Sequence, residues 1–122
     1  MRGERHFVNR LKEIGKADIC VPQPAFAEIA YGIHRLPHSK RRETLQDRLD
    51  LLRSELLRVQ WSDDVSDCFG TIKTKLEKKG QRIEDFDAAI AAHALAEGAV
   101  LVTTNLQHMT RVDGLVVEDW ST

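Results

Sequence analysis

The sequence predicts an α/β protein in which helices lie on both sides of a short parallel sheet. Stretches with apolar residues at helical spacing alternate with apolar runs that are short enough for single strands. One of these runs, AVLVT at residues 99–103, is apolar up to its last residue, as expected for a strand that is covered on both faces. The 122 residues contain no repeat, low-complexity segment or linker, so we expect residues 1–122 to form a single domain.

The individual elements are predicted from apolar spacing and from residues that begin or end helices. Helical spacing predicts helices near residues 7–14, 24–36, 39–57, 63–79 and 84–97. Pro24 suits the first turn of its helix, whereas Pro37, Gly80 and Gly98 are expected to end helices. Apolar or alternating stretches predict strands near residues 19–21, 59–61, 99–103 and 115–120.

Composition excludes several classes of function. The formal net charge is -1, so any binding to nucleic acid or to a membrane surface has to rely on a local patch. The basic patch is HSKRR, with Lys40, Arg41 and Arg42; it is either a solvated helix face or a contact for phosphate or a partner.

No apolar run is long enough to span a membrane and no signal peptide is recognisable. Cys20 and Cys68 suggest two buried thiols, so we expect a cytoplasmic protein.

Three residues are candidates for chemistry. Glu28 lies among alanine and glycine neighbours that leave space around its carboxylate, and Asp87 lies in the first turn of an alanine-rich helix, where a negative charge is favoured. Asn105 follows the strand at residues 99–103. Each has a plain structural alternative: an exposed glutamate, a helix-starting acid and a turn former.

Together with Thr103 and Thr104, these residues predict an oxygen-rich cluster at the carboxyl ends of the strands. Hard oxygen ligands favour Mg²⁺ or Mn²⁺ over zinc. Two carboxylates and an amide hold such an ion poorly, and a third carboxylate would make a better site.

The other polar residues carry weaker hypotheses. Asp85 is expected to cap the alanine-rich helix, and His93 within that helix is expected to pack. His108 lies in a turn near Arg111, where either residue is a candidate phosphate contact.

The stretch GQRIEDFDAAIAAHALAEGAVLVTTNLQHMTRVDGLVVEDW resembles the C-terminal half of VapC-type PIN domains, whose pattern includes F-D-x-x-I-A-A-x-A, then T-x-N and G-L-x-x-x-x-W. Upstream, VPQPAFAEIAYGI is similar to the strand and helix that carry the family's E-L-x-x-G motif. The resemblance covers roughly residues 7–121. It implies a PIN-like three-layer α/β/α fold and an endoribonuclease dependent on Mg²⁺ or Mn²⁺. It also implies the toxin of a toxin–antitoxin, plasmid-stability module that forms a homodimer and is neutralised by an antitoxin protein.

The resemblance also implies roles for particular residues. Glu28 and Asp87 match the second and third acidic positions of the family's metal site, and Asn105 matches the fourth. Thr103 matches the hydroxyl position near the metal. In this family the metal is expected to activate a water for attack on the RNA phosphodiester.

The chain departs from the family pattern at its start. Family members open with an apolar strand ending in D-T-N or D-S-S, which supplies the first metal-binding aspartate, and Asp18 does not fill that position. We therefore expect an N-terminally truncated member whose first, central strand is absent. Two interpretations stay open: an active ribonuclease, or a catalytically inactive PIN remnant that at most binds an antitoxin or RNA.

Overall fold

The computed structural model describes residues 9–10, 12–15 and 18–120. Helices and short strands alternate along the chain, in the order β1 Cys20–Pro22, α2 Gln23–His34, α3 Lys40–Glu55, β2 Leu57–Val59, α4 Asp63–Lys78, α5 Asp85–Glu97, β3 Leu101–Val102, α6 Leu106–Met109 and β4 Val117–Glu118. Residues 9–10 and 12–14 are also helical, and the rest of the helix expected at 7–14 lies outside the described residues. The predicted order of helices and strands is therefore correct except for α6, a short helix where a turn was expected.

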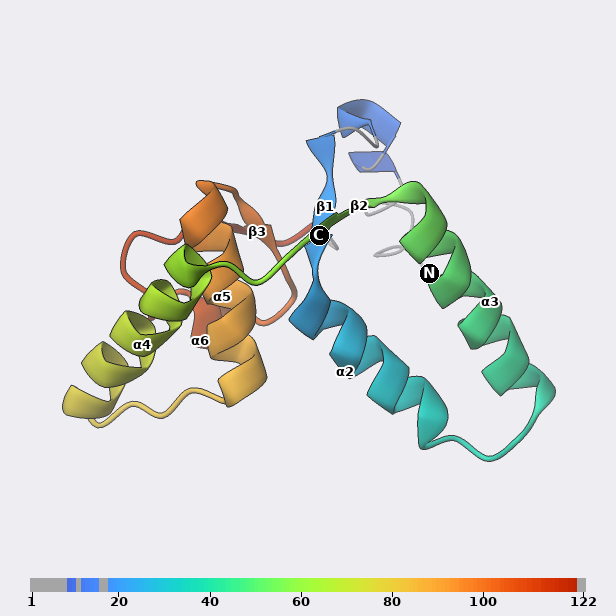
Figure 1. The fold of residues 1–122 in the computed structure, drawn as a ribbon, viewed down its shortest axis with the longest axis horizontal. Helices are drawn as coiled ribbons and strands as arrows, with labels where there is room; N and C mark the ends of the chain where they lie inside the picture. Colours follow the sequence, from blue (N-terminus) through green and yellow to red (C-terminus); the bar gives the residue numbers. More distant parts are fainter. Residues whose placement is uncertain (1–8, 11, 16–17, 121–122) are drawn as a thin grey trace.

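The strands pair in parallel, but in two separate sheets. β1 pairs with β2, with Cys20 opposite Leu57, and β3 pairs with β4, with Leu101 opposite Val117. Within the described part of the chain, no ladder joins the two pairs, and no strand precedes β1. The predicted α/β class with short parallel strands is confirmed, and the predicted sheet is divided into two halves. In Figure 1, β1 and β2 lie between the α2–α3 pair and the α4–α5 pair.

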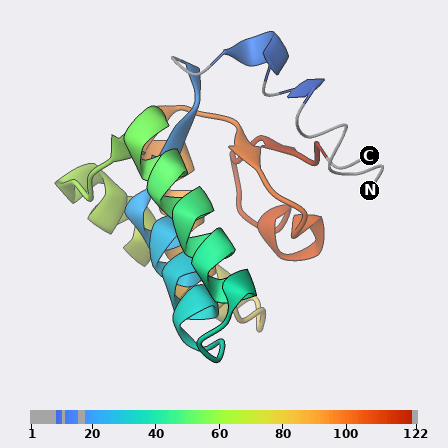
Figure 2. The same ribbon diagram turned by 90° about the vertical axis from the view of Figure 1, so that its right-hand side faces the viewer.

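Helices α2 and α3 form an antiparallel hairpin with its own small core. Figures 1 and 2 both show the two helices side by side. Phe26, Ile33 and Leu49 are buried between them. Apolar helical spacing also places Ile29 and Leu52 on these faces, but they are 40% and 39% exposed. The packing of the two helices covers the centre of each apolar face and leaves its edges open.

Helix α5 is central to the larger core. Its small residues Ala88, Ala91 and Ala92 are almost completely buried, and they pack with Ile72 and Leu76 of α4. Alanine side chains let neighbouring helices approach closely, and α5 contacts both α4 and α2. As a result, the first turn of α5 is held beside the middle of α2.

Helix boundaries agree with the chemistry of the residues found there. The side chains of Ser39 and Ser62 accept hydrogen bonds from the backbone N–H groups of Arg42 and Val65 and so cap α3 and α4. Gly98 ends α5 at φ 62° and ψ 32°, in the left-handed region that favours glycine.

The two cysteines do not behave as expected. Both are free, but Cys20 is exposed and Cys68 is only half-buried, so the prediction of two buried thiols is wrong. Cys20 is exposed because β1 is a strand of only three residues whose pairing partner covers one edge and not both faces. None of the described helices is both long and apolar enough to cross a membrane.

Candidate functional site

Helices α2 and α5 bring two carboxylates together. Glu28 lies in the middle of α2, and Asp87 lies in the first turn of α5. Partial burial and the negative charge of Asp87 raise the pKa of Glu28 above its ordinary value. Two like charges within electrostatic reach of each other disfavour ionisation, and a cation between them would remove that cost.

Asp87 is also the first member of a hydrogen-bonded chain that runs from α5 to α6. The side-chain N–H of Asn105 donates to Asp87 Oδ2 at 3.4 Å. The amide oxygen of Asn105 lies 2.7 Å from Nδ1 of His108. The backbone N–H of Asn105 donates to Oγ1 of Thr103 at 3.0 Å, which fixes the turn after β3. Asp87, Thr103 and Asn105 therefore come together, as the sequence predicted, whereas Thr104 is exposed.

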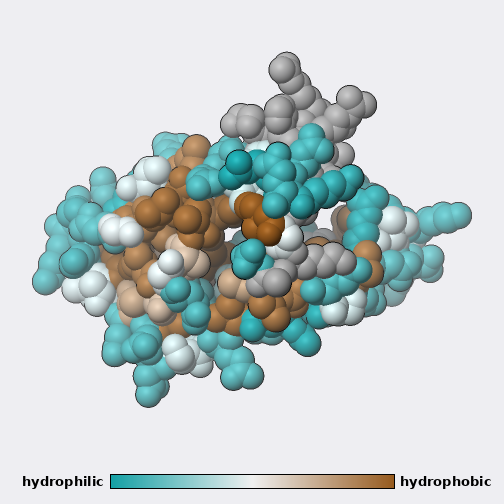
Figure 3. Space-filling model, turned by 90° about the horizontal axis from the view of Figure 1, so that it is seen from above, coloured by the Kyte–Doolittle hydropathy of each residue, from teal (hydrophilic) through white to brown (hydrophobic). Residues whose placement is uncertain are grey.

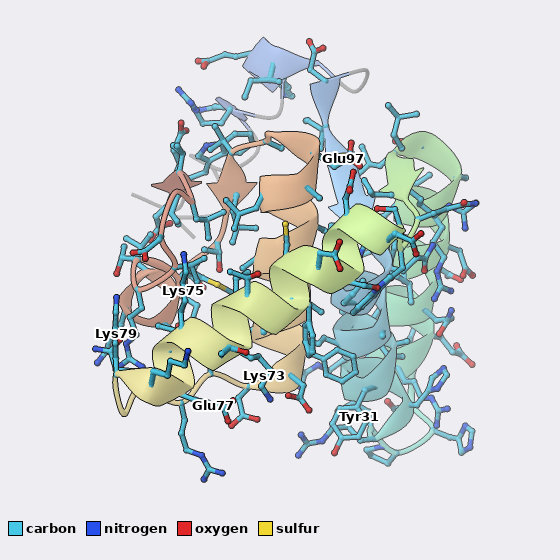
Figure 4. All side chains as sticks on the ribbon, turned by 60° about the vertical axis from the view of Figure 1, so that its left-hand side comes forward. Tyr31, Lys73, Lys75, Glu77, Lys79 and Glu97 are labelled. Atoms are coloured by element: carbon cyan, nitrogen blue, oxygen red, sulfur yellow. The ribbon has the colours of Figure 1, made fainter. Side chains whose placement is uncertain are left out.

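Asp87, Asn105 and His108 border a polar cleft of about 610 Å³ at the start of α5. The other polar side chains of its lining are Lys73, Glu77, Arg82, Glu84 and Asp85. Figure 4 shows Lys73 and Glu77 projecting from α4 on the side near the start of α5, whereas Lys75 and Lys79 project from its other side. The cleft holds four carboxylates against the cations Lys73 and Arg82, and Lys73 pairs with Asp85, so its balance of charge favours a bound cation.

The basic residues singled out in the sequence are divided between two places. Lys40 and Arg41 are exposed in the first turn of α3. Arg42 donates from its guanidinium to the carbonyl oxygen of Leu36 at 3.2 Å, so it holds the turn between α2 and α3. Arg111 donates to the carbonyl oxygen of Arg82 at 3.4 Å and lines a smaller cleft of about 200 Å³ beside α4.

The donor atoms fit a hard divalent cation in kind. Glu28 and Asp87 offer carboxylate oxygens, which Mg²⁺ and Mn²⁺ prefer. Among the residues that the structure describes, however, no group of three or more aspartate, glutamate, histidine or cysteine side chains is placed to hold a metal. The described residues thus supply two carboxylates, whereas such a cation is held better by three or more oxygen ligands from the protein.

Sequence reasoning missed two side chains at this site and misassigned a third. His108 was considered only as a phosphate contact, yet it bonds Asn105 at i−3 on the same turn, a spacing that can be read from the sequence. Lys73 was not considered. Asp85, expected to cap α5, instead forms an ion pair with Lys73, and Glu84 occupies the cap position without a side-chain capping bond. His93 is buried, as predicted.

Comparison with known proteins gives consistent matches over most of the chain. Residues 1–115 match the family model of the PIN domain. The chain is 35% identical over 115 residues to Ribonuclease VapC2 of Rickettsia felis, a match that covers 93% of this chain and 84% of that protein. It is 28% identical over 112 residues to the tRNA(fMet)-specific endonuclease VapC of Shigella flexneri, covering 88% and 80%. Among solved structures, the chain matches the crystal structure of VapBC2 from Rickettsia felis bound to a DNA fragment from their promoter. The TM-score is 0.83 at 35% identity, and the match covers 93% of this chain and 84% of that chain.

Proposed function

The chain belongs to the PIN-domain family, and from this membership we propose that it is a metal-dependent endoribonuclease, the VapC-type toxin of a toxin–antitoxin module. Two of its relatives are named as a ribonuclease and as a tRNA(fMet)-specific endonuclease. The observation that carries the proposal is that the contacting helices α2 and α5 place Glu28 within electrostatic reach of Asp87, which lines a polar cleft. Such paired carboxylates are costly without a cation, so they support a function that uses one.

The roles of the residues follow from their contacts. Glu28 and Asp87 would hold Mg²⁺ or Mn²⁺, which when bound supplies a Lewis acid for the phosphodiester and lowers the pKa of a water. Asn105, held by Thr103, steadies the Asp87 carboxylate. With a cation offsetting the carboxylates of the cleft, Arg82 at its edge would contact the phosphates of an RNA backbone, while Lys73 pairs with Asp85.

We further propose an antitoxin protein and a second copy of the chain as partners. The related structure from Rickettsia felis is of VapBC2 with DNA. Figure 3 shows apolar residues gathered over much of the upper face of the molecule. Large apolar side chains that are exposed among the described residues include Leu57, Val100 and Val116. Exposed apolar surface of this kind favours association with another protein chain.

A second candidate function is a PIN domain that binds an antitoxin or RNA without cutting RNA. One observation favours it: the described residues place no group of three acidic, histidine or cysteine side chains around a cation. Two carboxylates alone give weak affinity for Mg²⁺, which keeps most of its waters unless several ligands are supplied.

Cleavage of RNA by the purified chain decides between the two candidates. A panel of structured RNAs that includes tRNA(fMet) would be incubated with Mg²⁺, with Mn²⁺ and with EDTA. We expect cleavage that needs metal and that falls by about 100-fold or more in Asp87→Asn and Glu28→Gln. Asp47→Asn, an exposed carboxylate on α3, is the matched control and should cut like the wild type. Binding of RNA without cleavage, by a sample that is folded by circular dichroism, would favour the second candidate.

A further inference from the structure

We propose that His108 is a positioning residue of this site, which acts through Asn105 to fix the carboxylate of Asp87. The proposal deepens the proposed function and rests on it for its catalytic consequence, although the hydrogen-bonded chain can be tested without any activity. Three half-buried side chains form this chain: His108 Nδ1 lies 2.7 Å from the amide oxygen of Asn105, whose N–H group donates to Asp87 Oδ2 at 3.4 Å.

The side chain of Asn105 is free for this purpose because it does not cap α6. Asn105 is the N-cap residue of α6, a position at which asparagine normally accepts a bond from the first turn, yet its side chain makes no capping bond here. The backbone is held instead by Thr103 Oγ1 and by the bond from Met109 N–H to the carbonyl oxygen of Asn105 at 3.2 Å. The amide NH₂ is thus directed toward Asp87 in α5, and the amide oxygen faces His108 in α6.

The chemistry of the two neighbours selects one orientation of the amide. Asp87 as a carboxylate only accepts hydrogen bonds, so it requires the NH₂ group of Asn105 on its side. The amide oxygen then faces His108, which has to donate from Nδ1. The reverse orientation would place the amide oxygen against the carboxylate oxygen of Asp87, where the two repel each other.

This arrangement gives Asn105 a role beside any contact with a cation. Its oxygen accepts from His108 and its nitrogen donates to Asp87, so the amide is held at both ends. Asn105 therefore acts on Asp87, fixing the carboxylate through Oδ2 while its remaining lone pairs stay available to a cation. It is a neighbour that orients a ligand, as such neighbours do in many metal sites.

His108 is itself held by the core. The next residue, Met109, is 2% exposed and belongs to the same apolar cluster as Val112 and the helices α4 and α5. The chain is therefore anchored in the core directly after the histidine, which gives the hydrogen-bonded chain a fixed end.

The first test measures which nitrogen of His108 carries the proton. Long-range ¹H–¹⁵N spectra of the purified chain, recorded at about pH 8.5 where imidazole rings are neutral, should show the Nδ1–H form. His38 is an internal reference, since Arg42 lies 3.5 Å from its Nδ1 and can only donate, so His38 should show the Nε2–H form. Asn105→Ala should return His108 to the Nε2–H form, and His108→Gln and His38→Gln assign the signals.

The second test separates positioning from a general role in folding. His108→Asn places an amide N–H where Nδ1 lies, whereas His108→Leu removes the donor. Mn²⁺ affinity, measured by electron paramagnetic resonance, and kcat for RNA should fall by about 10- to 100-fold in the leucine variant, with KM little changed. The asparagine variant should restore most of both losses. If His108 had only a structural role, both variants would instead have a lower melting temperature, and the asparagine variant would not recover Mn²⁺ affinity or kcat.

The outcomes distinguish this proposal from the proposed function on which it rests. An Nε2–H form of His108 in the wild type would overturn the proposal, because the amide of Asn105 would then have to face the other way. Measurable Mn²⁺ affinity that is equal in wild type and His108→Leu would also overturn it. An Nδ1–H form that is lost in Asn105→Ala, in a protein that neither binds Mn²⁺ nor cuts RNA, would support the hydrogen-bonded chain and overturn the proposed function.

Discussion

The carboxyl groups of Glu28 and Asp87 come from different helices and are coupled. Burial and the charge of Asp87 raise the pKa of Glu28, although Glu28 itself lies on an exposed face of α2. The alanine-rich surface of α5 explains the coupling, since it lets α2 pack closely beside the first turn that carries Asp87. Holding two like charges together lowers the free energy of unfolding, and such a cost is typical of functional sites.

Glu28→Gln should therefore stabilise the protein in the absence of metal. A raised pKa means that the folded state binds more protons than the unfolded state, so the cost of charged Glu28 is absent at low pH and grows as pH rises through the glutamate range. The gain in unfolding free energy should be about 0.5 kcal/mol or less at pH 7, because solvent screens this exposed group, and it should vanish near pH 4. Urea denaturation in EDTA at the two pH values measures it.

Added Mn²⁺ should reverse the order of stability, because the wild type binds the ion and Glu28→Gln loses a ligand. Asp47→Asn, on α3, controls for the loss of a surface charge and should show neither effect. A glutamine variant that is less stable than the wild type at pH 7 without metal would contradict this explanation.

His93 should make the protein sensitive to acid. The ring is 2% exposed, lies edge-on to Trp61 at 5.4 Å, and neither ring nitrogen has a hydrogen-bond partner among the described residues. Burial lowers its pKa, and the charge of Glu97 opposes the shift. The unfolded state consequently binds the proton first, so the free energy of unfolding should fall as pH drops below about 6.5 and level off below the folded pKa.

Replacing this histidine tests the explanation directly. His93→Leu removes the titrating group, so urea midpoints between pH 7 and pH 5 should vary less than in the wild type. His34→Gln, at an exposed position in α2, should keep the wild-type dependence. If His93→Leu retains the full loss of stability over this range, another group is responsible.

Local signals made much of the fold predictable. Ser39 and Ser62 cap helices through bonds to residues three positions later, and Gly98 ends α5, so these boundaries depend on short stretches of sequence. Glu28 and Asp87 could be identified because the resemblance adds information that spacing lacks. Their proximity follows from packing between α2 and α5, which periodicity alone does not give.

The unpredicted features depend on contacts between distant residues. Asp85 reads as a helix cap, but it pairs with Lys73, twelve positions earlier, because α4 lies beside the start of α5. The division of the strands into two sheets is likewise a matter of tertiary arrangement, since each strand is only two or three residues long. The role of His108 was missed for a different reason: its i−3 contact is local, but it depends on Asn105 not capping its own helix.

Two glycine substitutions should have opposite effects. Gly98 has a φ of 62° and its N–H bonds the carbonyl oxygen of Leu95 at 3.1 Å, so Gly98→Ala should cost about 1 kcal/mol through backbone strain. Gly70 lies within α4, where an added Cβ meets nothing within 4 Å, so Gly70→Ala should gain about 0.5–1 kcal/mol. Thermal unfolding of the pair measures both, and a stabilising Gly98→Ala would refute the assigned backbone conformation.

The basic residues at the start of α3 should separate into one structural and two functional side chains. Arg42 donates to the carbonyl oxygen of Leu36, so Arg42→Ala should lower the free energy of unfolding by about 1 kcal/mol. Lys40 and Arg41 are exposed, so replacing both by alanine should leave stability within about 0.5 kcal/mol of the wild type.

If Lys40 and Arg41 contact RNA phosphates, their joint replacement should also reduce the dependence of RNA affinity on salt. Each contact to a single strand releases counterions and contributes about 0.7 to the slope of log affinity against log salt concentration, so the slope should fall by about 1.4. Filter binding between about 50 and 200 mM salt, the range over which such contacts are resolved, measures it, with an inactive Asp87→Asn background to prevent cleavage. An unchanged slope, with stability intact, would show that this face is solvated or belongs to a protein partner instead.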